Sequence, residues 1–228
     1  METVVIIIML AVALTFLLKL TCLPPAGMLA VCALTALFVG FSQEYAVSQS
    51  KTQIADWLAD PQLMLDTSVL LTLDVAMQIA FCFLCSRRVA GESLPRWQET
   101  AYLITLWFPG ILIFPVLFWL LVEIIFAMPG MSFAMLGWST AIGVLIAAPL
   151  LSLGFKWLLP DKDSRLELIF LVNLLTAALG VIATVNGRTA TAGTAQVDWT
   201  ALCGVLALII AGAVAGLVIR KIRVSRKY

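Results

Sequence analysis

The sequence has 228 residues, of which 62% are hydrophobic and 12% are charged, and its formal net charge is +1. Soluble globular domains are about half apolar and about a quarter charged. This composition therefore excludes a soluble globular domain and predicts a protein that lies in the lipid bilayer. The near-neutral charge argues against a nucleic-acid partner. The chain has no histidine, which excludes bis-histidine haem ligation, most zinc and di-iron sites, and histidine-based catalysis.

Seven apolar runs follow one another along the chain, each long enough to cross a hydrocarbon core of about 30 Å. The stretches between them are too short for a soluble domain, so we expect one all-α integral membrane domain over residues 1–228. The N-terminus lacks the basic region and cleavage site of a secretory signal, so we interpret the first run as a retained helix. The expected spans are 3–20, 25–42, 63–86, 101–128, 132–153, 166–185 and 199–219.

Local signals place the starts of several of these helices. Pro25 and Pro61 suit the first position of a helix, and Asp60 is a suitable N-cap for the third span. Ser164 and Glu167 have the spacing of a capping box, which predicts the start of the sixth span.

The fourth span contains Pro109-Gly110 and Pro115. Proline removes a helix hydrogen bond and clashes with the preceding turn, so we expect a kinked helix here. The alternative is a short re-entrant segment followed by a shorter span.

The loop from Gln43 to Gln62 is the largest between spans. Within it Ile54, Trp57 and Leu58 recur at helical spacing opposite Asp56, which predicts a short amphipathic helix on the membrane surface. A polar loop with one interfacial tryptophan is the alternative.

Basic residues predict the orientation of the chain, because cytoplasmic loops of membrane proteins are enriched in them. With an external N-terminus and a cytoplasmic C-terminus, twelve basic residues fall on the cytoplasmic side, including Lys19, and two, Lys51 and Arg188, fall outside. We interpret the basic segment after residue 219 as a topology anchor.

Asp74 stands near the middle of the third span, where a charged group is costly and therefore a functional candidate. Gln78 lies on the same helix face, as do Thr67 and Cys85. Asn173 and Thr176 share a face of the sixth span. We expect these two faces to meet and Asn173 or Thr176 to hydrogen-bond Asp74, which could carry a proton, bind a cation or substrate amine, or simply join two helices.

Four other charged residues lie near the ends of spans. Asp66 and Glu123 lie near the outer ends of the third and fourth spans, where together they could form an ion entry mouth. Lys19 and Glu167 are expected to extend towards water at the inner surface. For all four residues an interfacial position without a special role is the favoured interpretation.

Other motifs are weak. Cys82 and Cys85 have the spacing of a redox pair, but they lie at the cytoplasmic end of a membrane helix, so we interpret them as small apolar residues. Gly212 and Gly216 form a small-residue face that permits close helix packing in the seventh span. The chain contains no P-loop, dinucleotide-binding or hydrolase motif.

These observations predict a subunit of a larger membrane complex in the cytoplasmic (inner) membrane of a prokaryote, linked to ion or proton movement. We expect membrane lipids and other membrane subunits as partners, no nucleotide, no cofactor and no metal. A self-contained small transporter or channel that uses Asp74 is the first alternative. A membrane enzyme is the second and the less favoured, because the polar cluster that it would need is missing.

Overall fold

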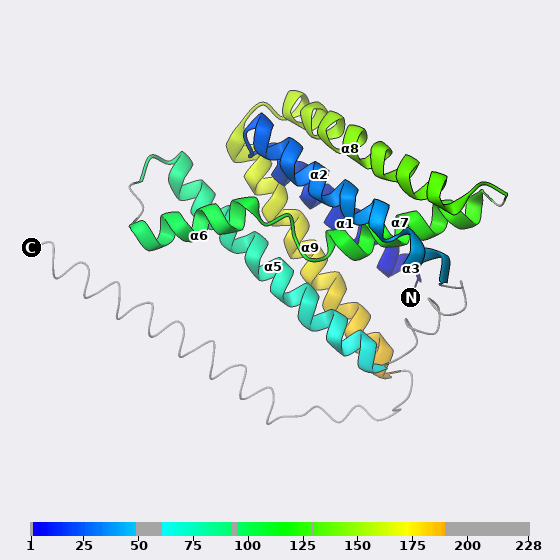
Figure 1. Ribbon diagram of the computed structural model, residues 1–228. Coiled ribbons are helices and arrows are strands. Elements are labelled where there is room, and N and C mark those ends of the chain that lie inside the picture. Colours follow the sequence, from blue (N-terminus) through cyan, green and yellow to red (C-terminus); the bar gives the residue numbers. More distant parts are fainter. Residues whose placement is uncertain (1, 49–60, 93–94, 129, 190–228) are drawn as a thin grey trace, which may run out of the picture. The chain divides into compact units, whose positions relative to one another are not determined.

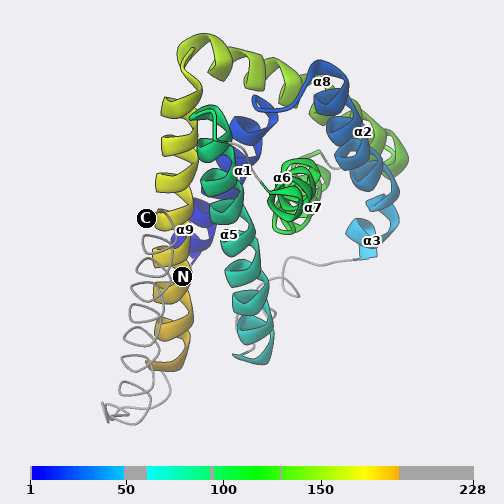
Figure 2. The ribbon, with the colours of Figure 1, turned by 90° about the vertical axis from the view of Figure 1, so that its left-hand side faces the viewer.

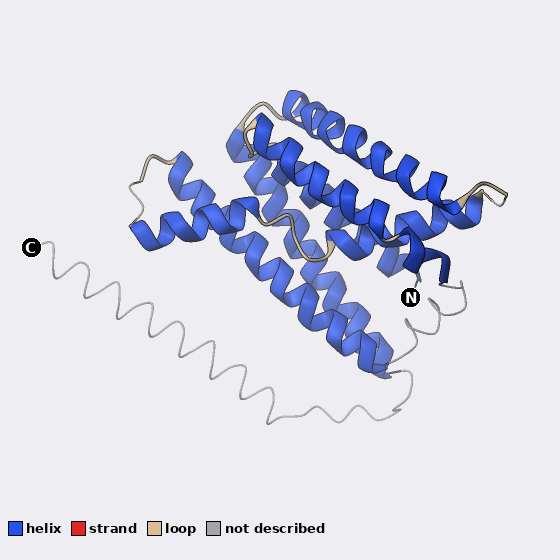
Figure 3. Ribbon diagram, viewed as in Figure 1, coloured by secondary structure: helices blue, strands red, loops and turns tan. Residues whose placement is uncertain are grey.

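The computed structural model describes residues 2–48, 61–92, 95–128 and 130–189. Within these residues the chain forms eight helices and no strand. Figure 3 colours the described residues as helix or loop. The all-α prediction is therefore confirmed for this part of the chain. The helices are α1 (Glu2–Leu20), α2 (Pro25–Phe41), α3 (Gln43–Ser48), α5 (Pro61–Val89), α6 (Arg96–Trp107), α7 (Ile113–Ala127), α8 (Phe133–Leu158) and α9 (Lys162–Thr189).

Three of the described helices are long and apolar enough to cross a membrane: α5, α8 and α9. Their apolar stretches are Val69–Val89, Phe133–Leu158 and Lys162–Ile182. The helices α1, α2 and α7 are also apolar but shorter. A chain with this many apolar helices is a membrane protein, because no soluble core of this size could cover their surfaces.

Most helix boundaries lie close to the predicted ones. α2 and α5 begin at Pro25 and Pro61, where a proline costs no helix hydrogen bond. The predicted start of the sixth span is wrong, because α9 begins at Lys162 rather than behind a capping box at Ser164. Arg165 donates its backbone N–H to the Asp161 carbonyl over 3.3 Å, which places Arg165 in the first turn of the helix.

The predicted fourth span is broken rather than kinked. α6 ends at Trp107 and α7 begins at Ile113, with Phe108 as the C-cap of α6. In this break Pro109 has no N–H to donate, and Gly110 adopts a φ of +107°, which an L-amino acid with a side chain rarely adopts. The two helices nevertheless follow one another along one line (Figures 1 and 2), so the segment does not fold back on itself.

The helices pack mainly in antiparallel pairs. α5 lies along α9, and α2 lies along α8, in both ribbon views (Figures 1 and 2). Gly180 of α9 permits the first of these contacts, because a Cβ atom there would lie 2.7 Å from Leu71 of α5. α1 contacts α7, α8 and α9 and so lies between the two pairs.

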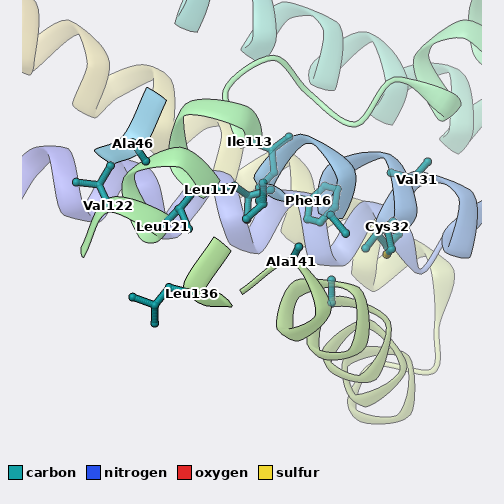
Figure 4. Packing of buried hydrophobic residues seen from close by; sticks show 14 of the residues in the cluster. Phe16, Val31, Cys32, Ala46, Ile113, Leu117, Leu121, Val122, Leu136 and Ala141 are labelled. Atoms are coloured by element: carbon teal, nitrogen blue, oxygen red, sulfur yellow. The ribbon is translucent and has the colours of Figure 1, made fainter. Parts of the chain in front are cut away.

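The buried apolar side chains form two separate cores, and α1 contributes to both. Phe16 and Leu20 of α1 pack with α2, α7 and α8 in the first core, part of which Figure 4 shows. Leu18, on another face of α1, packs with α5, α6 and α9 in the second core. The segment around residues 16–20 is therefore enclosed on two sides, and it includes Lys19.

Two predicted elements lie outside the described residues. They are the amphipathic surface helix of the loop after α2 and the seventh span at 199–219, which includes Gly212 and Gly216. The short helix α3 occupies the beginning of that loop.

Candidate functional site

Asp74 occupies the middle of α5 and faces the break between α6 and α7. Its side chain is 4% exposed, and its Oδ1 atom accepts a hydrogen bond from the backbone N–H of Ile111 over 2.6 Å. Ile111 stands just before α7, where the N–H groups have no partner within the helix. The positive end of a helix stabilises a carboxylate. The contact therefore gives both the Ile111 N–H group and the Asp74 carboxylate a hydrogen-bond partner.

Lys19 reaches the same break from α1. Its Nζ atom donates hydrogen bonds to the Phe108 carbonyl over 2.7 Å and to Gln78 Oε1 over 2.9 Å. Phe108 caps the C-terminus of α6, where carbonyls have no partner within the helix and attract a cation. The ammonium group also lies 4.8 Å from the centre of the Phe81 ring, within the range of a cation–π contact.

The position of Lys19 corrects the prediction that it extends to the membrane surface. Its side chain is 2% exposed and is turned inward. The reason is that its two acceptors compensate the cost of burying an ammonium group. Glu167, for which the same prediction was made, is exposed on α9.

Gly110 lies in the break, directly against two polar side chains of α5. A Cβ atom on this residue would lie 3.1 Å from Asp74 Oδ1 and 3.1 Å from Gln78 Nε2. Its positive φ lets the backbone turn here, and its missing side chain lets both polar groups of α5 reach the break. We call Lys19, Asp74, Gln78 and the backbone of residues 108–111 the break centre.

The break centre therefore pairs each free helix end with a side chain of opposite charge. Lys19 meets the negative end of α6 and Asp74 the positive end of α7, while Gln78 bonds Lys19 one turn away from Asp74. Lys19 and Asp74 form no direct ion pair; the ion pair in the described residues is between Arg87 and Glu92. A gap beside Lys19, lined also by Pro109 and by apolar side chains, leaves no room for a water molecule.

The predicted partners of Asp74 bond elsewhere. α5 and α9 do pack together, but the Asn173 Nδ2 atom donates to the Ile169 carbonyl over 2.7 Å and to Thr15 Oγ1 over 3.5 Å. The Thr176 hydroxyl donates to the Val172 carbonyl over 2.8 Å. These two buried side chains of α9 therefore make hydrogen bonds within α9 and to α1, separate from the hydrogen bonds of Asp74.

The remaining candidates do not join the break centre. Glu123 is exposed on α7, and the side chain of Asp66 lies outside the described part of α5. Thr67, placed on the polar face of α5 by its spacing, is exposed, whereas Cys85 on that face is buried. In the described residues no group of three acidic or cysteine side chains could hold a metal ion.

Cys22, in the turn after α1, stands near one end of α5. A hydrogen bond from the Cys85 thiol and the nearby cations Arg165 and Lys19 lower the pKa of the Cys22 thiol to about 7, although burial opposes them. Cys22, Cys32, Cys82 and Cys85 are all free thiols. The expected role of Cys82 and Cys85 as small buried residues agrees with their position in the second core.

No family model, curated protein or solved structure matches this chain. The function must therefore be argued from the break centre itself. Sequence reasoning found Asp74 and Gln78 but missed Lys19, although a lysine in the last turn of an apolar helix and a Pro-Gly pair within another are both visible signals.

Proposed function

We propose that this chain is a multi-pass subunit of a membrane assembly that moves protons or small cations, and that the break centre is its functional site. The observation that carries the proposal is the burial of Lys19 and Asp74 at the two ends of one broken helix. Interrupted membrane helices with charged groups at their free ends are typical of ion and substrate sites in transporters. A structural joint between helices would need neither charge.

The arrangement favours protons over larger substrates. The gap beside Lys19 has no space for a water molecule, so a bulky ligand could bind at that point only if the helices separated. A proton needs no such space, because it can bind the Asp74 carboxylate and change the charge that holds Ile111.

The topology forms a second part of the proposal. We infer seven spans, an external N-terminus and a cytoplasmic C-terminus, in a prokaryotic cytoplasmic membrane. Lys19 and Arg165 are buried and do not count as loop residues, which leaves ten basic residues on the cytoplasmic side against two outside. Reporter fusions after Arg88 and Lys162 should give cytoplasmic signals, and fusions near Gln53 and Thr191 external ones. Two reversed signals would refute this topology.

The role of Asp74 is tested by proton flux into vesicles that contain the assembly purified in mild detergent. Asp74→Asn keeps the shape and most hydrogen bonding of the side chain but cannot change charge. We expect this variant to lose proton uptake while its melting temperature stays near that of the wild type. Glu123→Gln, which neutralises an exposed carboxyl group of α7, is the matched control and should keep full uptake. Full uptake by Asp74→Asn would end the proposal that Asp74 carries protons.

The same preparation separates a subunit from a self-contained transporter. A subunit should bring other polypeptides through mild extraction, and mass spectrometry would identify them. If the chain is extracted alone and still moves protons in vesicles, the self-contained transporter becomes the better description.

A further inference from the structure

A cavity of about 490 Å³ lies where the turn after α1 meets the ends of α5, α8 and α9 and the middle of α6. It is separate from the break centre, since the residues of the two sites do not overlap. Its size is within the range of small-molecule sites in proteins. The residues that line it are Thr21, Cys22, Cys85, Arg88, Val89, Tyr102, Lys156, Lys162, Arg165 and Leu166.

Arg165 is the unusual member of this lining. Its side chain is 2% exposed, yet its Nε and Nη1 atoms have no hydrogen-bond partner among the described residues. Two buried guanidinium nitrogens without acceptors are costly, because they have lost their hydrogen bonds to water and have no replacement. Proteins almost always give such a group a carboxylate or another acceptor. Arg165 therefore needs an acceptor from outside the described residues, and an anion bound in the cavity would supply it.

The charges around the cavity show what kind of acceptor fits. Arg88, Lys156 and Lys162 are exposed residues of the lining, and together with Arg165 they make four cations. No acidic residue lines the cavity within the described chain. Arg88 is held in place by the Tyr102 ring, whose centre lies 4.8 Å from the guanidinium carbon. The first turn of α9, which includes Lys162 and Arg165, adds the positive end of a helix.

We infer that this cavity binds a phosphate-bearing anion, with Arg165 as its main ligand. A guanidinium offers paired N–H donors that match phosphate oxygens, and lysines add charge without fixed geometry. The phosphate group can belong to an anionic phospholipid or to a soluble phosphate. Basic pockets between membrane helices commonly bind lipid head groups, so both sources are tested below.

The soluble source is tested on the detergent-solubilised full chain, whose thermal unfolding is followed with inorganic phosphate and with chloride at equal ionic strength. We expect phosphate to raise the melting temperature of the wild type and of Arg96→Gln, a matched control that removes an exposed arginine outside the cavity. Arg165→Gln should bind phosphate about tenfold more weakly or worse, because it loses a charged and buried donor. Arg165→Lys should keep part of the affinity.

The lipid source is tested in vesicles of phosphatidylcholine alone and of phosphatidylcholine mixed with phosphatidylglycerol. Native mass spectrometry after extraction should find phosphatidylglycerol retained by the wild type and by Arg96→Gln, but lost from Arg165→Gln. Retention of lipid without an effect of inorganic phosphate assigns a head-group site, and the reverse result assigns a soluble phosphate site. If Arg165→Gln behaves as Arg96→Gln in both experiments, the inference is wrong.

Two further measurements make the test of the anion site independent of the folding of Arg165→Gln and of the proton proposal. If Arg165→Gln does not fold, a double variant of the exposed residues, Lys156→Gln with Lys162→Gln, should show weaker binding of the same probes. Asp74→Asn should bind them as the wild type does, because Asp74 does not line the cavity. Failure of the proton proposal would therefore leave the anion site untouched, and the converse also holds.

Discussion

Replacement of Gly110 by alanine should damage the break centre directly. The new methyl group would lie 3.1 Å from both Asp74 Oδ1 and Gln78 Nε2, closer than most side-chain contacts. The φ of +107° would also be strained for any residue with a Cβ atom. The substitution therefore adds backbone strain and pushes Asp74 away from the N–H group of Ile111.

The expected loss of stability has two parts. A positive φ costs a residue other than glycine about 1–2 kcal/mol. Weakening the hydrogen bond between Asp74 and Ile111 costs about 1–2 kcal/mol more, since polar contacts within membranes contribute less than those of charged groups in water. We expect Gly110→Ala to lower the free energy of unfolding by about 2–4 kcal/mol in total.

Gly91→Ala separates the two parts, because Gly91 has a φ of +76° and a Cβ atom added there would meet nothing within 4 Å. It should cost about 1–2 kcal/mol from the backbone alone. Unfolding in mixed detergent micelles, measured for both variants, gives the contribution of the break centre as the difference. Equal losses for the two variants would refute the close approach of Gly110 to α5.

Three other positions give independent tests of the packing and the charges. Lys19→Met removes two hydrogen bonds of a buried cation and should lower the free energy of unfolding by about 1–3 kcal/mol, measured in mixed micelles. The alkylation rate of Cys22 should rise through a midpoint near pH 7, because a lowered pKa yields thiolate above that pH, and Cys85→Ala should move the midpoint to higher pH. Gly180→Ile should destabilise the packing of α5 against α9 by about 1–3 kcal/mol, whereas Gly143→Ile should be almost silent, as melting curves would show.

Each of these has a result that would count against it. Lys156→Met, which removes an exposed lysine, should change the free energy of unfolding little. If Lys156→Met and Lys19→Met lower it equally, the buried hydrogen bonds of Lys19 do not contribute to stability. A midpoint for Cys22 at its ordinary value near pH 9 would mean that Cys85 and the cations are too far away to lower the pKa of the Cys22 thiol. A silent Gly180→Ile would contradict the contact with Leu71.

The helices could be predicted from the sequence because their cause is local. Runs of apolar residues set the lengths of α1 and α2, and prolines set the first residues of α2 and α5. The end of α8 was predicted less well, since the helix continues five residues beyond the predicted span, to Leu158. Boundaries of this kind depend on packing as well as on composition.

The break centre could be predicted only in part. The cost of charge in hydrocarbon singled out Asp74, and Pro109-Gly110 indicated a disturbed helix. The sequence did not show that these two features meet, or that Lys19 completes them. That pairing depends on the depth of each helix in the bundle, which a pattern along one helix does not contain. Asn173 was placed on the correct neighbouring helix but bonds Thr15 of α1.

The hydrogen bonds of Lys19 can form only late in the synthesis of the chain. Its acceptors lie 59 and 89 residues further along the chain. At about 5–20 residues per second, the ribosome adds the second acceptor only about 4–18 s after Lys19 itself. Until Gln78 has been added, α1 carries an ammonium group with neither acceptor, and its long side chain can reach water from the last turn of the helix. The inward position of Lys19 is therefore a late event, which must follow synthesis of the broken helix.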